Sequence, residues 1–283
     1  MPCFSLLVRL PGWAVSTLKP REFCEYNREA RFNRMNREAF AETADSSWRP
    51  LYRVGAVAAF AAVILFRPHL SAELSLLHSL GLIQWGATPG STQEWLTLLR
   101  SQPLLGLLLL EVGDLVHYTL LGLVFLALFG AMREARRSTL LIAASAGLVG
   151  ITVYFASNPA FALLSLSRQY EAAAAAQKDS LLAAAQAVLA GSNPAGLYQG
   201  TGIYVSLFLI HLAGLLASIA MLRGGVFSNA AAITGLLANG LYLLYFPVLA
   251  LAPAWLALPP SLAAPFRMAW HVLVGVRLLR LHE

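Results

Sequence analysis

Charged residues are scarce in this chain. They make up only 12% of its 283 residues, whereas about 25% is typical of soluble domains. Hydrophobic residues make up 58%, and the mean hydropathy is +0.65. This composition excludes an ordinary soluble domain and indicates an integral membrane protein, with room for roughly six helices of about 20 residues. The lipid bilayer is therefore its expected partner.

Cysteine is also scarce, because Cys3 and Cys24 are the only two. Both precede the first apolar run, so the sequence predicts neither a disulfide framework nor a cysteine-based metal site in the membrane. The net charge of +6 would raise the question of nucleic acid in a soluble protein. In a membrane protein, cationic residues collect at the cytoplasmic ends of helices, so we interpret the charge as a topology signal and expect no nucleic-acid partner.

The N-terminal region lacks the continuous apolar core of a cleavable signal peptide, because Arg9 interrupts the only candidate stretch. The mixed charges that follow predict that residues 1–49 form a cytoplasmic tail that is helical in part. Met35 offers a second translation start, and under that interpretation residues 1–34 would not belong to the protein.

Long apolar runs fill the rest of the chain. They predict an all-α integral membrane bundle in residues 50–283, with six transmembrane helices at about 50–66, 103–132, 139–157, 200–222, 226–251 and 262–279. Most basic residues, including Arg133, Arg136 and Arg137, fall on the inner side if the N-terminus is inside. Arg267 is among the few assigned to the outer side. The bias predicts a plasma or inner membrane protein with both termini cytoplasmic.

Two helices are predicted outside the hydrocarbon. Ser91 and Glu94 have the spacing of a capping box, and they predict a short helix that lies on the membrane surface. Residues 160–191 carry four charged residues in an alanine-rich helical pattern, which predicts one amphipathic helix on the outer side. Three tryptophans that flank spans are expected to be interfacial anchors: Trp85, Trp95 and Trp255.

Ionisable side chains interrupt the apolar run Leu107–Phe125. A charged group at the centre of a membrane helix costs at least about 2.5 to 3.5 kcal/mol, so it normally faces protein or a water-filled cavity and has a partner. Polar residues near the middle of the later spans could share that depth. The sequence therefore predicts a polar cluster at the membrane midplane, formed by Glu111, Asp114, His117, Tyr118, His211, Asn239 and His271.

Several functions remain open for this cluster. In a structural network, Asp114 or Glu111 would accept hydrogen bonds from His211, His271 or Tyr242 and lock the bundle. In a transporter, the same groups would form a path for protons or a small molecule. Burial raises the pKa of a carboxyl group and lowers that of a histidine, so that protons can exchange between them near neutral pH.

A metal site is a further alternative. His117, His211 and His271 with Asp114 would give the three-histidine, one-carboxylate zinc site of an intramembrane hydrolase. No HxxxH or HExxH pair accompanies these histidines, so we favour a non-enzymatic protein without a cofactor. Sensing or partner binding through the charged tail is the last alternative. The sequence leaves the oligomeric state open.

Four segments together resemble a bacterial family of multi-pass membrane proteins with about six spans and no assigned activity. The segments are Leu51–Phe66, Glu111–Glu134, Ala162–Gly191 and His271–Leu281. The resemblance covers residues 51 to 283 and implies a fold and a membrane location, but it implies no functional residue. Residues 1–34 lie outside it.

Overall fold

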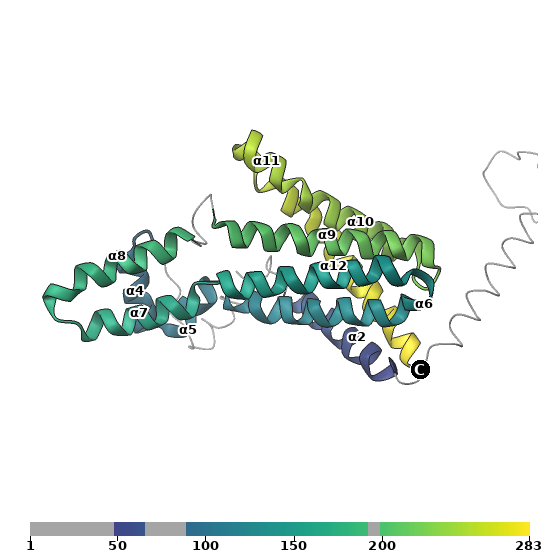
Figure 1. Cartoon of the computed structure of the whole chain (residues 1–283), viewed down its shortest axis with the longest axis horizontal. Coiled ribbons are helices and arrows are strands. Elements are labelled where there is room, and N and C mark those ends of the chain that lie inside the picture. The colour runs from purple at the N-terminus through teal and green to yellow at the C-terminus, as the bar shows by residue number, and fades with distance from the viewer. Residues whose placement is uncertain (1–47, 66–88, 192–198) are drawn as a thin grey trace, which may run out of the picture. The chain divides into compact units, whose positions relative to one another are not determined.

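The computed structural model describes residues 48–65, 89–191 and 199–283. The predictions for the N-terminal tail, for Met35 as a start and for Trp85 lie outside these residues. The described part of the chain is helical, without strands, which confirms the all-α class (Figure 1). Its elements are α2 (Arg49–Ile64), α4 (Thr92–Ser101), α5 (Pro103–Leu109), α6 (Val112–Ser157), α7 (Ala160–Ala172), α8 (Ala175–Gly191), α9 (Thr201–Gly224), α10 (Asn229–Leu243), α11 (Tyr245–Leu251), the 3-10 helix η3 (Pro253–Trp255) and α12 (Leu258–His282).

Four helical stretches of the described chain are long and apolar enough to cross a membrane. They are Val112–Ala172, Thr201–Gly224, Asn229–Leu251 and Pro253–His282. Large apolar side chains lie exposed along them, with Ile142 60% and Leu251 84% accessible. In water such surfaces favour aggregation or binding, whereas in hydrocarbon they face a matching solvent. The length, composition and exposed apolar surface agree on a helical membrane protein.

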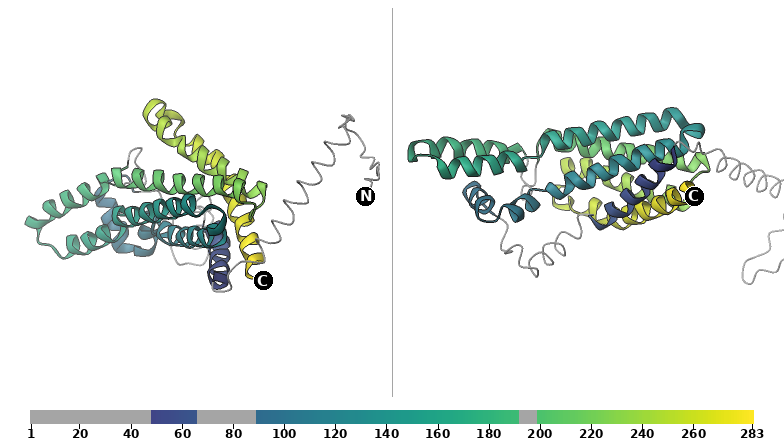
Figure 2. Two further views of the ribbon diagram at one scale, coloured as in Figure 1. Left: turned by 45° about the vertical axis from the view of Figure 1, so that its right-hand side comes forward. Right: turned by 90° about the horizontal axis from the view of Figure 1, so that it is seen from below.

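Helix α6 reverses direction at Arg136, whose φ of −149° and ψ of 47° are not helical. Its two halves then run antiparallel, as the ring centroids of Tyr118 and Tyr154, 4.5 Å apart, show. Figures 1 and 2 show the two halves side by side. The reversal falls at the basic cluster between the predicted segments 103–132 and 139–157.

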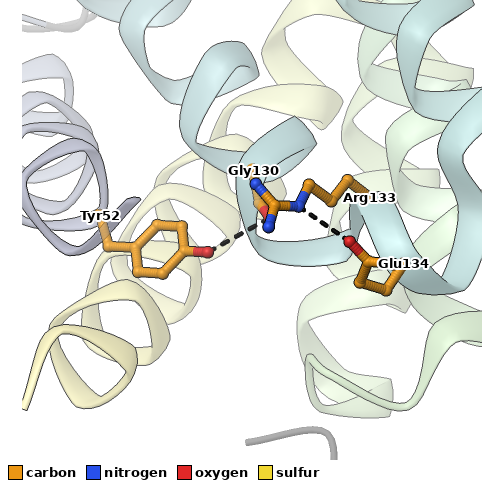
Figure 3. Close-up of polar contacts among 4 residues, drawn as sticks. All are labelled: Tyr52, Gly130, Arg133 and Glu134. Atoms are coloured by element: carbon orange, nitrogen blue, oxygen red, sulfur yellow. Dashed lines mark hydrogen bonds and ion pairs between the residues drawn. The ribbon is translucent and has the colours of Figure 1, made fainter. Parts of the chain in front are cut away.

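The long helices form a closed ring. Helix α2 packs on α6, α6 on α9, α9 on α10, α10 on α12, and α12 returns to α2. At the junction of α2 and α6, the Tyr52 hydroxyl donates to the Gly130 carbonyl at 3.2 Å (Figure 3). Nearby, the Arg133 guanidinium pairs with Glu134 at 3.0 Å and lies 4.6 Å from the ring centre of Trp48. The ring encloses five side chains of the predicted polar cluster, which are buried: His117, Tyr118, His211, Asn239 and His271.

Three predicted helices are interrupted. The segment 103–132 breaks after α5, because Glu111 adopts the left-handed region at φ 66° and α6 begins only at Val112. The segment 226–251 divides into α10 and α11 at Leu244. The predicted single helix at 160–191 is two helices, since Ala173 is extended at φ −75° and ψ 143°. Helical composition alone did not show these breaks.

Helices α4, α5, α7 and α8 pack together at the end of the bundle where α6 begins and ends, and we call this group the end cap (Figure 1). The capping role predicted for Ser91 at its first helix is confirmed, whereas Glu94 binds the amide of Gly90 and not that of Ser91. The Glu94 amide donates to Ser91 Oγ at 3.3 Å, and Glu94 Oε2 accepts from the Gly90 amide at 2.7 Å. An exposed ion pair of Arg100 with Glu171 joins α4 to α7.

Trp95 does not fit the prediction that the three tryptophans are interfacial anchors. Only 1% of Trp95 is exposed, and it belongs to a core formed with Leu99, Leu163 and Leu189 of α4, α7 and α8. Its role as an interfacial anchor was therefore wrong, because the apolar faces of the short helices bury one another. Trp255, in contrast, is 65% exposed, as expected of a residue that faces lipid or the interface.

Candidate functional site

Two carboxylates meet at one tyrosine near the start of α6. The Tyr154 hydroxyl lies 3.0 Å from Glu111 Oε2 and 3.2 Å from Asp114 Oδ2. The left-handed turn at Glu111 ends α5 and starts α6 one residue later, and it allows both carboxylates to reach the same hydroxyl. Because a tyrosine hydroxyl carries one hydrogen, the two carboxylates share a single donor.

Aromatic rings connect these carboxylates to the middle of the bundle. Tyr118 packs edge-on against Tyr154, with ring centroids 4.5 Å apart, and its ring centroid lies 5.6 Å from that of His117. The His117 ring in turn lies 6.1 Å from His271 on α12. Tyr118, His117 and His271 are all buried. A series of side chains with polar atoms, in contact through their rings, therefore leads from the carboxylates at Tyr154 to the centre of the bundle.

His211 joins three helices. Its Nδ1 lies 3.1 Å from Asn239 Oδ1, and Arg267 Nη2 lies 2.8 Å from its Nε2 and 3.1 Å from its Nδ1. The arginine can only donate and the amide oxygen can only accept. These partners assign the hydrogen of His211 to Nδ1 and leave Nε2 as the acceptor. His211 is thus a neutral imidazole with both nitrogens engaged.

Tyr242 completes this group from α10. The His211 ring stacks on the Tyr242 ring at 3.7 Å between centroids, and the Arg267 guanidinium lies 4.9 Å from the same ring centre. Asn239 Nδ2 also donates to the Gly235 carbonyl at 2.8 Å. The stacked and hydrogen-bonded side chains fix α9, α10 and α12 against one another.

Close approach of α9 and α10 depends on Gly214. A Cβ atom at this position would lie 2.6 Å from Asn239 Nδ2. No real Cβ atom accepts such a distance, so any side chain here would displace the Asn239 amide that orients His211. The hydrogen bond between Asn239 and His211 therefore requires a glycine at position 214.

A small cavity lies between these groups. About 10 Å³ is available to the centre of a water molecule, and a single water needs about that much. The cavity is lined by His117, Leu121, Phe125, Ile210, His211, Gly214, Asn239, Arg267, Trp270 and His271. Two nitrogens of buried residues in this lining, Trp270 Nε1 and His271 Nε2, have no hydrogen-bond partner within the described chain. The cavity is thus lined both by polar groups that have hydrogen-bond partners and by polar groups that lack one in the described chain.

The structure divides the predicted cluster in two. His117, His211, Asn239 and His271 line one cavity, while Glu111 and Asp114 lie with Tyr154 and are linked to it through Tyr118. The predicted hydrogen bonds from His211 and His271 to the carboxylates were wrong. Both nitrogens of His211 are engaged elsewhere, and His271 Nδ1 donates to the Arg267 carbonyl at 2.9 Å.

Three contributors were not among the residues predicted for the cluster. Arg267 was counted with the outer side and lies on the polar stripe of the last span, and its guanidinium contacts His211 inside the bundle. Trp270 lines the cavity. Tyr154 supplies the hydroxyl that binds the two carboxylates. Its place beside Tyr118 could have been predicted from the sequence. Tyr118 and Tyr154 are equally far from Arg136 in the sequence, so a hairpin centred there brings the two tyrosines together.

The predicted histidine and aspartate ligand set is not assembled. Among the described residues, no three His, Cys, Asp or Glu side chains are placed to hold one metal ion. The two nitrogens of His211 face Asn239 and Arg267. The positive charge of the arginine repels a metal cation that would bind at the histidine nitrogen beside it.

No protein-family model, curated protein sequence or solved structure matches this chain.

Proposed function

We propose that this protein is a six-span bacterial inner membrane protein that moves protons, or a small solute together with protons, through its polar core. The span count is supported by six segments that alternate in direction around the ring. They are α2, the first half of α6, the second half of α6, α9, α10 with α11, and α12. Helix α2 is the shortest of the six segments. It has 16 residues, and an α-helix rises by about 1.5 Å per residue. Arginines at its start can extend it by reaching to the interface.

The distribution of arginine supports a cytoplasmic location for both termini. The Tyr52 contact to Gly130 places the start of α2 beside the Arg136 reversal, and Arg277 Nε donates to the Val226 carbonyl at 2.7 Å beyond the end of α9. One end of the bundle thereby carries Arg49, Arg53, Arg133, Arg136, Arg137, Arg223, Arg277 and Arg280. Basic residues mark the cytoplasmic side, so the end cap would face outward.

A reporter that is active only outside the cytoplasm tests this topology. Fused after Gly191 in the end cap, it should be active, and fused after Glu283 it should be inactive, because these positions lie at opposite ends of the bundle. Activity would be measured in intact bacterial cells with equal fusion levels. Activity after Glu283 together with inactivity after Gly191 would reverse the proposed orientation.

The single observation that carries the transport proposal is the connected polar series from the carboxylates to the cavity. Glu111 and Asp114 stand at the end-cap side, and Tyr118 and His117 lead from there to the cavity. Further along α6 toward Arg136, the cavity is bounded by apolar Leu121 and Phe125. A polar route that reaches the middle of the bundle and then meets an apolar barrier is the arrangement expected of a transporter closed on one side.

Proton flux into liposomes tests this proposal. The purified protein, reconstituted with a pH-sensitive dye inside, should dissipate an imposed proton gradient faster than protein-free liposomes. Asp114→Asn keeps an oxygen for the Tyr154 hydroxyl but cannot carry a proton on its side chain. Because a positioned proton-transfer group contributes on the order of a hundredfold, Asp114→Asn should reduce the protein-dependent flux to near background.

Asp179→Asn is the matched control, since Asp179 is exposed on α8 and should leave the flux unchanged. Both variants should keep the thermal unfolding midpoint of the original protein, which separates loss of a proton carrier from loss of fold. Equal flux for Asp114→Asn and the unchanged protein, or no flux above background for the unchanged protein, would contradict the proposal.

A further inference from the structure

His271 lines the cavity, and one of its ring nitrogens has no hydrogen-bond partner among the described residues. The residue is only 3% exposed, and its Nδ1 lies 2.9 Å from the carbonyl oxygen of Arg267, one turn earlier on α12. A carbonyl oxygen can only accept, so the hydrogen of the neutral ring is on Nδ1. Nε2, on the other side of the ring, therefore presents a lone pair, and no described residue donates to it.

The lining of the cavity limits what can donate to this lone pair. His211 and Asn239 are engaged with each other, and the Asn239 amide nitrogen donates to Gly235. The guanidinium of Arg267 also lines the cavity, and its positive charge disfavours a cation that stays bound at the same place, although a proton can still pass through it briefly. What remains is a small neutral molecule that carries an O–H or N–H donor.

The volume of the cavity fits a single water molecule. The space available to the centre of a water molecule is about 10 Å³, the volume that one water occupies by this measure. The rings of His117 and His271 lie 6.1 Å apart between centroids. That separation suits a bridging water better than a direct hydrogen bond between two imidazoles.

We propose that the cavity is a binding site for a single water that donates a hydrogen bond to His271 Nε2 and lies between His271 and His117. This inference rests on the proposed proton transport and makes His271 Nε2 the proton-accepting atom at the end of the polar series. When the water carries an excess proton, one of its O–H bonds breaks as the N–H bond at Nε2 forms. The ring becomes an imidazolium and a neutral water remains. Release reverses the same step.

Solid-state NMR of the full protein in liposomes, labelled with ¹⁵N-histidine, tests this assignment directly. The His271 signals are identified by their loss in His271→Gln and, in the unchanged protein, by contact with the Trp270 indole, whose centroid lies 5.0 Å from the His271 ring. At neutral pH, Nδ1 should be protonated and Nε2 should be bare, with a cross-peak to a slowly exchanging water. A protonated Nε2 with a bare Nδ1, or a bare Nε2 without a water contact, would overturn the inference.

Combining this measurement with the flux assay separates the two proposals. A water contact at Nε2 in a protein that conducts no protons would refute transport but leave the water site in place. Proton flux without that contact, or undiminished flux in a folded His271→Gln protein, would refute the role of His271 while transport stands. His282→Gln, at the end of α12, is the control and should change neither the flux nor the His271 signals.

Discussion

Trp95→Ala is expected to unfold the end cap while the bundle stays folded. Trp95 is 1% exposed and packs in one core with Leu163 and Leu189, and replacing a buried tryptophan by alanine costs about 3 to 5 kcal/mol. Trp95 is the largest of the fully buried side chains in the described chain, so its removal takes away a large part of the core that the short helices of the end cap share. Hydrogen exchange in detergent should therefore speed up by orders of magnitude over residues 160–191 and remain slow in α9.

Trp255→Ala provides the matched control, because the Trp255 side chain is 65% exposed. Its removal should leave hydrogen exchange in the end cap unchanged. If Trp95 were instead an interfacial anchor, Trp95→Ala would behave like Trp255→Ala. That result would refute the core described for the end cap.

Gly214→Ala is expected to destabilise the bundle at the polar site itself. The new Cβ atom would lie 2.6 Å from Asn239 Nδ2, so the Asn239 side chain or helix α10 has to move. Overpacking of this kind typically costs about 1 to 3 kcal/mol. Displacement of Asn239 also removes the hydrogen bond that orients His211. The thermal unfolding midpoint in detergent should fall by several degrees, and proton flux should fall with it.

Gly240→Ala tests whether the effect belongs to that position. Gly240 lies one residue after Asn239 in α10, and a Cβ atom there would meet nothing within 4 Å. Alanine is also the better helix former, so this variant should be at least as stable as the original. Equal destabilisation by both substitutions would attribute the loss to glycine itself, and the close contact at Gly214 would not explain it.

Much of the helical architecture was predictable from the order of residues. Apolar runs located the long helices, the Arg133 to Arg137 cluster located the reversal within α6, and Ser91 with Glu94 located the start of α4. Each of these signals is local. A charged cluster leaves the hydrocarbon, and a capping side chain binds an amide three residues away, whatever the rest of the chain does.

The candidate site was predictable only in outline. The depth of His117, His211, Asn239 and His271 within their helices was enough to suggest a shared cluster, and the four residues do line one cavity. Their partners were not predictable, because a partner depends on how each helix is rotated and how far it slides along its neighbour. A shift of one residue turns a side chain by about 100°.

By itself, the sequence determined that this is a helical membrane protein with ionisable groups in its apolar segments. The tertiary structure decided three further points. Glu111 breaks a helix and shares Tyr154 with Asp114, Arg267 turns inward to His211, and Trp95 is buried by protein. The physical reason is the same for all three. Hydrophobicity says that a face avoids water, but only packing decides whether that face meets lipid or another helix, and which polar groups come within hydrogen-bonding distance.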